Sequence, residues 1–176
     1  MLEAHGLSRR KAGRGFEASH AFSVATIVAD YGFEEDTIIA ALLHDTLEDT
    51  DLDPSVIKEK FGGLVLDIVR DVSEPLMPRR WRDRKLSYIE QLRASERHGS
   101  RAVAAADKIH NLSKMTAGLL AHGTSYIRPF TAPVEDMIWY HQSVLDTLCE
   151  TWDHPILMEQ ANRLDSFVDA AALART

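Results

Sequence analysis

Four residues that can bind metals or carry protons follow an apolar run in the segment AALLHDTLEDTD, residues 40–51. They are His44, Asp45, Glu48 and Asp49. On a helix over residues 36–50, with about 100° per residue, these side chains share one patch, because Glu48 follows His44 by four residues and Asp49 follows Asp45 by four. Acidic groups near a helix C-terminus oppose the helix dipole, at roughly 0.3–1 kcal/mol each. The pattern therefore predicts a bound cation, with a solvated acidic turn as the alternative.

An imidazole beside a carboxylate, as in His44 and Asp45, favours a divalent metal ion with the other two acids as proton carriers. His20 is a further candidate ligand, although a lone histidine there is more often a core or capping residue. Asp107 interrupts AVAAADKIHNL, an otherwise apolar helical segment, and Asn111 lies four residues later on the same face. A carboxylate on a packing face needs a partner. The residues thus predict a site of two histidines and two aspartates with room for water.

Helical periodicity dominates the segments around these residues, and strand signals are scarce. SHAFSVATIVADYG should end at Gly32, with an inward face made of Phe22, Val24, Ala25, Ile27 and Val28. In DPSVIKEKFGG, Asp53 is the expected N-cap, Pro54 the first helical residue, and Gly62 and Gly63 the stop. Ser100 is the expected cap of the Ala-rich helix that carries Asp107. We predict an all-α helical bundle of about seven or eight helices.

The composition is ordinary for a soluble globular protein of the cytoplasm, and local basic clusters could bind a small anion. The 176 residues suit one domain, residues 1–176, and no apolar run approaches the roughly 20 residues of a membrane span. No signal-peptide pattern opens the chain. Cys149 is the only cysteine, which suits a reducing compartment. A formal charge of −7 argues against general nucleic-acid binding. The oligomeric state is left open.

Together, the residues resemble a known family. His20, the pair His44-Asp45 and the distant Asp107 resemble the H…HD…D pattern of the HD-domain metal-dependent phosphohydrolases. HDTLEDTD is similar to the HDxxED motif of the RelA/SpoT-type (p)ppGpp hydrolases, and AADKIHNLSKM is similar to their ADRLHN segment. SHAFSVATIVADYG and EKFGGLVLDIV resemble the helices beside those motifs. The similarity extends from about Arg9 to about Leu148, and the pairing of the two motifs is its most specific part.

The resemblance implies an all-α fold, a Mn²⁺ ion and removal of pyrophosphate from the ribose 3′ position of (p)ppGpp. It implies that His20, His44, Asp45 and Asp107 bind the metal. Glu48 and Asp49 would activate and orient the attacking water, and Asn111 would contact ribose or phosphate. SRRKAGRG resembles the family's RRK stretch, which makes Arg10 and Lys11 the expected contacts to base and phosphates. Such chemistry suits these residue types, because a metal lowers the pKa of its bound water from about 15.7 towards 7.

Two basic clusters, residues 9–14 and residues 79–85, could bind diphosphates, although most basic runs are solvated faces. Trp81, Trp139 and Tyr140 could stack on a base, although aromatic residues at helical spacing are more often core. The irregular segment 121–134 is long enough to form a lid.

Two alternative functions stay open beside the (p)ppGpp hydrolase. Phe16 replaces the family's Pro-Tyr before the first histidine, and Met137 stands where a pocket tyrosine is expected. These changes favour a phosphohydrolase that acts on another phosphorylated nucleotide. The second alternative is a nucleotide-binding module without turnover, which applies if Glu48 and Asp49 point away from the ion. The length of the chain suggests a stand-alone hydrolase with no synthetase domain.

Overall fold

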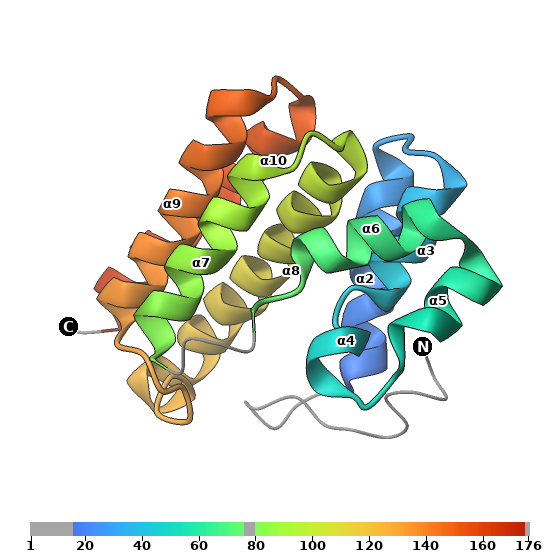
Figure 1. Ribbon diagram of the computed structural model, residues 1–176. Coiled ribbons are helices and arrows are strands. Elements are labelled where there is room, and N and C mark those ends of the chain that lie inside the picture. The colour runs from blue at the N-terminus through green and yellow to red at the C-terminus, as the bar shows by residue number, and fades with distance from the viewer. Residues whose placement is uncertain (1–15, 76–79, 175–176) are drawn as a thin grey trace.

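The structure is a computed structural model that describes residues 16–75 and 80–174, and its elements are helices (Figure 1). The all-α prediction is confirmed, with eight described α-helices of eight or more residues and one short helical turn, α4. The elements are α2 (Glu17–Asp30), α3 (Glu35–Leu43), α4 (Thr46–Asp49), α5 (Pro54–Phe61), α6 (Gly63–Val72), α7 (Trp81–Ala94), α8 (His98–His122), the 3₁₀-helix η1 (Gly123–Tyr126), α9 (Val134–Thr151) and α10 (Pro155–Leu173).

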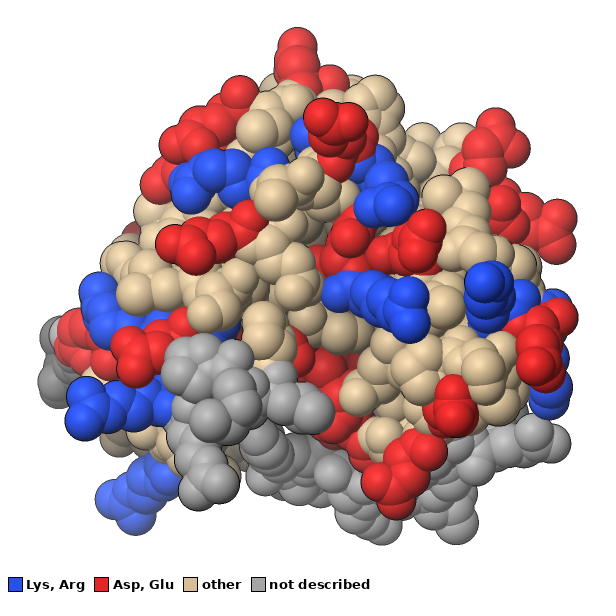
Figure 2. All heavy atoms as spheres, in the orientation of Figure 1, with Lys and Arg blue, Asp and Glu red and all other residues tan. Residues whose placement is uncertain are grey.

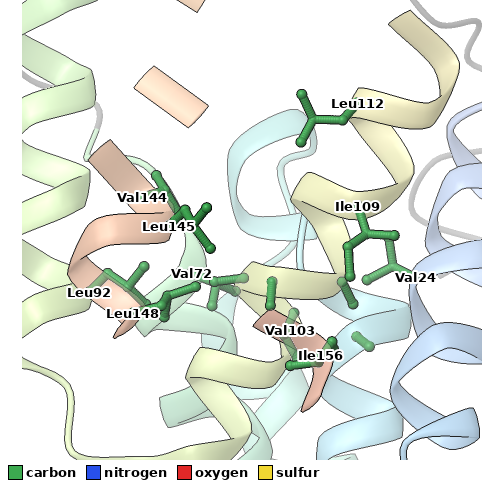
Figure 3. Packing of buried hydrophobic residues seen from close by; sticks show 14 of the residues in the cluster. Val24, Val72, Leu92, Val103, Ile109, Leu112, Val144, Leu145, Leu148 and Ile156 are labelled. Atoms are coloured by element: carbon green, nitrogen blue, oxygen red, sulfur yellow. The ribbon is translucent and has the colours of Figure 1, made fainter. Parts of the chain in front are cut away.

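Helix α8 is the centre of the fold. It passes between α7 and α9 on one side and α2, α3 and α6 on the other, and α10 packs along it (Figure 1). Its residues 102–106, all Ala or Val, are completely buried, because small side chains allow the neighbouring helices to approach closely. Figure 3 shows the apolar core around this helix, with Val24 near Ile109 and with Leu92 beside Leu148. The central position of α8 places Asp107 inside the bundle.

A partly buried carboxylate anchors the N-terminus of α8 to α6. Asp71 accepts hydrogen bonds from the hydroxyls of Ser95 and Ser100, both at 2.6 Å, and from Arg97 Nη1 at 3.0 Å. The prediction that Ser100 caps α8 is therefore wrong, since the helix begins at His98 and Ser100 lies in its first turn. The link fixes the axial position of the helix that carries Asp107.

The ends of α5 and α2 follow the capping residues predicted from the sequence, but the inward face of α2 was predicted with one error. Asp53 accepts a hydrogen bond from Ser55 N at 2.8 Å, Pro54 is the first residue of α5, and Gly62 ends that helix with φ 92°. Gly32 ends the turn after α2 with φ 77°. Phe22 was expected to face inward, but 51% of it is exposed because the buried face of α2 runs through His20, Val24 and Val28.

Within the described residues, no helix combines the length and the apolar character that a membrane crossing requires. The prediction of a single domain over residues 1–176 stays a prediction.

Candidate active site

The expected single helix over residues 36–50 is wrong, because it is interrupted at His44 and Asp45. Helix α3 ends at Leu43 and the short turn α4 begins at Thr46. His44 Nδ1 lies 2.8 Å from the carbonyl of Ala41, and the Thr46 hydroxyl donates to the carbonyl of Leu43 at 2.6 Å. These side chains satisfy carbonyls at the helix end. The break therefore gives His44 and Asp45 a fixed orientation that a regular helix would not provide.

The structure brings together the four side chains predicted to hold a metal, from α2, the α3–α4 break and α8. His20 Nε2 lies 3.2 Å from His44 Nε2 and 3.1 Å from Asp107 Oδ1. Asp45 approaches both rings, with Oδ1 3.1 Å from His44 Nε2 and Oδ2 3.5 Å from His20 Nε2. His44 Nε2 lies 3.9 Å from Asp107 Oδ1. His20, His44 and Asp45 thus form a group whose ligand atoms lie within 4.8 Å of one another, and Asp107 Oδ1 lies beside both imidazoles.

This arrangement fits a divalent cation. Ligands at about 2.1 Å from an octahedral ion lie roughly 3 Å from one another along an edge, close to the observed separations. The site also favours positive charge: burial opposes the charged His44 ring, but the carboxylates of Asp45 and Asp107 raise its pKa. Burial would likewise raise the pKa of Asp107, yet Lys108 and the two imidazoles hold it well below its usual range. Nitrogen and oxygen donors without thiolate are typical of Mn²⁺, Fe²⁺ or Zn²⁺ sites.

Two neighbours on α8 hold the candidate ligands in place. His110 Nδ1 lies 2.6 Å from His20 Nδ1, so the opposite nitrogen of His20 points at the site. Asn111 Nδ2 donates to Asp107 Oδ1 at 2.5 Å. Such contacts orient ligands and raise metal affinity. Asn111 was expected to contact the substrate, and no role was predicted for His110, although His110 lies three residues after Asp107 on the same face of the helix.

Glu48 and Asp49 lie on the α4 turn in different surroundings. Glu48 is largely buried and accepts a hydrogen bond from Glu74 N at 2.5 Å. Burial raises the pKa of Glu48 to about 7. The hydrogen bond from the Glu74 amide lowers this pKa, and the negative charge of Asp45 raises it further. Asp49 is exposed and groups with Glu17 and Asp45, whose carboxylate oxygens approach within 4.8 Å. Both acids line the same cavity as the predicted metal ligands.

A cavity of about 780 Å³ opens above these residues, a volume typical of sites for small molecules. Tyr126, Phe130 and Ala132 of the irregular segment 121–134 line it. Tyr126 packs against Gly118 of α8, where any Cβ atom would overlap its ring. The segment 121–134, whose length would permit a lid, thus contributes residues to the cavity wall.

Some of the basic residues predicted to bind substrate lie outside the described residues. These are Arg10, Lys11 and the rest of the cluster 9–14. In the second cluster, Arg84 and Lys85 line the cavity and pair with Glu74. Arg82 pairs with Asp136 and stacks on Trp139 instead. On the face in Figure 2, basic and acidic side chains are interspersed.

Several polar cavity residues were missed or given no role by the sequence analysis, because helical spacing gave no sign that they face a cavity. They are Glu74, Lys108, His110 and His141. Of the aromatic residues considered for stacking, Trp81 and Tyr140 line the cavity.

An HD-domain family model matches residues 2–124, so the chain belongs to the HD-domain family, and that membership implies a divalent metal ion. The solved structure of lmo0812 from Listeria monocytogenes is 28% identical, with a TM-score of 0.75 over 84% of this chain and 94% of the other. A metazoan ortholog of SpoT, described as hydrolysing ppGpp, has a TM-score of 0.77 over 93% of this chain and 89% of its own, and at 24% identity it supports the fold alone.

Among curated relatives, a protein of Aquifex aeolicus named guanosine-3′,5′-bis(diphosphate) 3′-pyrophosphohydrolase is 47% identical over 72 residues, which are 41% of this chain. A Haemophilus influenzae protein of the same name is 32% identical over 115 residues, which are 62% of this chain. The chain covers only 10% and 17% of these relatives. The resemblance to the RelA/SpoT-type hydrolases is confirmed, and the chain carries an HD domain.

Proposed function

We propose that this protein is a Mn²⁺-dependent guanosine-3′,5′-bis(diphosphate) 3′-pyrophosphohydrolase that converts (p)ppGpp to GDP or GTP and pyrophosphate. The observation that carries the proposal is the convergence of His20, His44, Asp45 and Asp107 below a cavity that also contains Glu48. The names of the curated relatives support the choice of substrate. A cytoplasmic location belongs to the same proposal.

In this proposal His20, His44, Asp45 and Asp107 hold the divalent ion. When bound, the ion supplies Lewis-acid chemistry, which lowers the pKa of water and polarises a phosphoryl oxygen. His110 and Asn111 keep two of the ligands oriented through the contacts described above. The chain therefore provides a rigid, anionic ligand set before any substrate arrives.

Glu48 is the proposed general base. A pKa of about 7 lets its carboxylate take a proton from the attacking water near neutral pH. The water oxygen bonds to the phosphorus on the ribose 3′ oxygen, and the bond between that phosphorus and the 3′ oxygen breaks. Glu48 can then return the proton to the 3′ oxygen, so that GDP and pyrophosphate form from ppGpp and one water. Asp49, on the same turn, orients the water.

Substrate binding is assigned to the residues that the family resemblance indicated. Asn111 lines the cavity and can contact ribose or phosphate with the part of its amide that does not hold Asp107. Arg10 and Lys11 are assigned to the base and phosphates on the motif alone.

A second candidate keeps the chemistry and changes the nucleotide. Met137 is buried and lines the cavity, so an apolar side chain faces the ligand where the family pattern has a tyrosine. A phosphohydrolase acting on a different phosphorylated nucleotide fits this observation. The non-catalytic binding module is less well supported, because Glu48 and Asp49 both line the cavity.

The test is a panel of phosphorylated nucleotides, including ppGpp and pppGpp, incubated with purified protein and several divalent ions. We expect release of pyrophosphate and GDP from ppGpp with Mn²⁺, and no turnover for Asp45→Ala or Asp107→Ala. Asp83→Asn is the matched control, because Asp83 is an exposed acid on α7. Lack of ppGpp turnover at full metal occupancy contradicts the proposal, and turnover of another nucleotide favours the second candidate.

A further inference from the structure

One buried lysine and one partly buried lysine face the cavity from the wall formed by α7, α8 and α9. Lys85 belongs to α7 and Lys108 to α8, and both line the cavity. Their side chains are only 16% and 8% exposed. The two ammonium nitrogens lie 4.5 and 5.2 Å from the centre of the same ring, that of Tyr140 on α9. Helices α7 and α9 lie side by side, and α8 contacts α9 (Figure 1).

The acidic partners of these lysines leave hydrogen-bonding capacity unused. Lys85 Nζ pairs with Glu74, and Lys108 Nζ lies 2.6 Å from Asp107 Oδ2. An ammonium group has three donors, so pairing with Glu74 leaves Lys85 two donors for a ligand. Lys108 contacts Asp107 and the hydroxyl oxygen of Tyr140, which leaves it one. The buried hydroxyl of Tyr140 finds no hydrogen-bond acceptor among the described residues. Three side chains thus surround one part of the cavity, each with at least one donor left for a ligand.

Two ammonium groups around one aromatic ring repel each other, and their burial adds a desolvation cost. Burial lowers the pKa of Lys85, and the positive charge of Lys108 lowers it further, whereas the carboxylate of Glu74 raises it. An anion bound between the two lysines would remove this repulsion and would accept the unused hydrogen bonds. A phosphate group does both, because it carries negative charge on several acceptor oxygens.

We propose that Lys85, Lys108 and Tyr140 form the subsite for the diphosphate group that the substrate carries on its 3′ oxygen. The placement follows from chain adjacency: Lys108 directly follows Asp107, so a phosphorus beside the metal ligands has its second phosphate within reach of this wall. The inference rests on the proposed function for the identity of the nucleotide. Of the two basic clusters, it assigns residues 79–85, through Lys85, to the binding of the 3′ diphosphate.

Direct binding of a non-hydrolysable diphosphate tests the subsite without turnover. Methylenediphosphonate is titrated calorimetrically into Mn²⁺-loaded protein, with the same free Mn²⁺ concentration in cell and syringe. We expect Lys85→Met to raise the dissociation constant at least ten-fold, and Arg93→Met to leave it unchanged, because Arg93 is a half-exposed cation on the same helix that pairs with Glu150. Equal affinities for wild type and Lys85→Met, or no binding by wild type, overturn the inference.

Two further variants separate contact from indirect effects. In the double variant Glu74→Gln/Lys85→Met the local net charge is the same as in wild type. Weak binding in this variant supports direct contact by Lys85, whereas restored binding shows that Lys85 only screens Glu74 and overturns the inference. Tyr140→Phe keeps the ring and removes the hydroxyl; we expect three- to ten-fold weaker binding. If Lys85→Met does not fold, the Tyr140→Phe variant tests the subsite by itself. Unchanged binding of methylenediphosphonate by Tyr140→Phe then overturns the inference.

A kinetic comparison distinguishes the 3′ from the 5′ diphosphate. ppGpp and pGpp share the 3′ group and differ at the 5′ end. Equal losses of kcat/KM for both nucleotides in Lys85→Met support a 3′ subsite, and a larger loss for ppGpp overturns it. If neither nucleotide is turned over, the proposed function fails, while the calorimetric result still decides whether this wall binds a diphosphate.

Discussion

The Nδ1 atom of His20 lies 2.6 Å from the Nδ1 atom of His110, so a histidine on α8 holds the candidate metal ligand of α2 from behind. The two rings are tilted by 37°, with their centres 4.8 Å apart. When His20 Nδ1 donates to His110 Nδ1, the lone pair of the His20 ring is on Nε2, which lies 3.1 Å from Asp107 Oδ1 and 3.5 Å from Asp45 Oδ2. The site therefore depends on a residue outside the four-ligand motif.

Replacing His110 should weaken metal binding without removing a ligand. His110→Phe keeps a ring of similar size and loses the contact to His20, and we expect Mn²⁺ affinity to fall roughly 10- to 100-fold. Isothermal titration of Mn²⁺ into metal-free protein measures this. His122→Phe is the control, because His122 is an exposed residue at the end of the same helix. Unchanged affinity in His110→Phe would show that His20 is held by other groups.

Glu48→Gln should act on turnover more than on binding. The amide can still accept the hydrogen bond from Glu74 N, but it cannot take a proton, so we expect kcat to fall by roughly 10²- to 10⁴-fold. KM and Mn²⁺ affinity should change little, because Glu48 is not among the four candidate ligands. Steady-state kinetics compare it with Glu90→Gln, an exposed position on α7. A drop of less than three-fold in kcat is incompatible with Glu48 as general base.

Stability should depend on pH through His141, which is buried and whose Nδ1 finds no hydrogen-bond partner among the described residues. Burial, together with Lys108 and Lys85, lowers its pKa to about 3. Between pH 6.5 and 3 the unfolded chain binds the proton and the folded chain does not, so the stability contribution is present above pH 6.5 and is lost as the pH falls.

For this residue we expect wild type to lose roughly 2 kcal/mol more stability than His141→Gln between pH 7.5 and 5. Urea unfolding in the presence of a chelator, repeated at several pH values, gives the two curves. Taking the difference between the proteins removes the contributions of the other histidines. Parallel curves over this range would mean that His141 titrates normally in the folded protein.

Gly118 should be intolerant of even one methyl group. A Cβ atom there overlaps the ring of Tyr126, which lines the cavity, so Gly118→Ala must displace the η1 segment. We expect a loss of about 1–3 kcal/mol in the free energy of unfolding and a higher KM. At Gly63, also helical, an added Cβ contacts nothing, and Gly63→Ala should be neutral or slightly stabilising. Chemical denaturation and kinetics of both variants measure these effects; equal stabilities would argue against tight packing of Tyr126.

Much of the fold could be predicted because it follows from local rules. Apolar periodicity predicted the long helices, and Asp53, Pro54 and Gly62 predicted the ends of α5, since capping depends on neighbouring residues only. The interruption at His44 was not predicted, because the same residues also fit a continuous helix. Phe22 was misplaced because a helix of small and apolar residues does not indicate which face the partner helices cover.

By itself the sequence determined the residue types of the site and the helices that carry them, because HDTLED and ADKIHN are contiguous motifs whose chemistry is readable from composition and spacing. Only the tertiary structure decided which side chains meet. The contact of His20 with His110 and the gathering of Lys85, Lys108 and Tyr140 join residues from different helices. These meetings depend on how α2, α7 and α9 pack around α8, and packing is set by the shapes of all the buried side chains together.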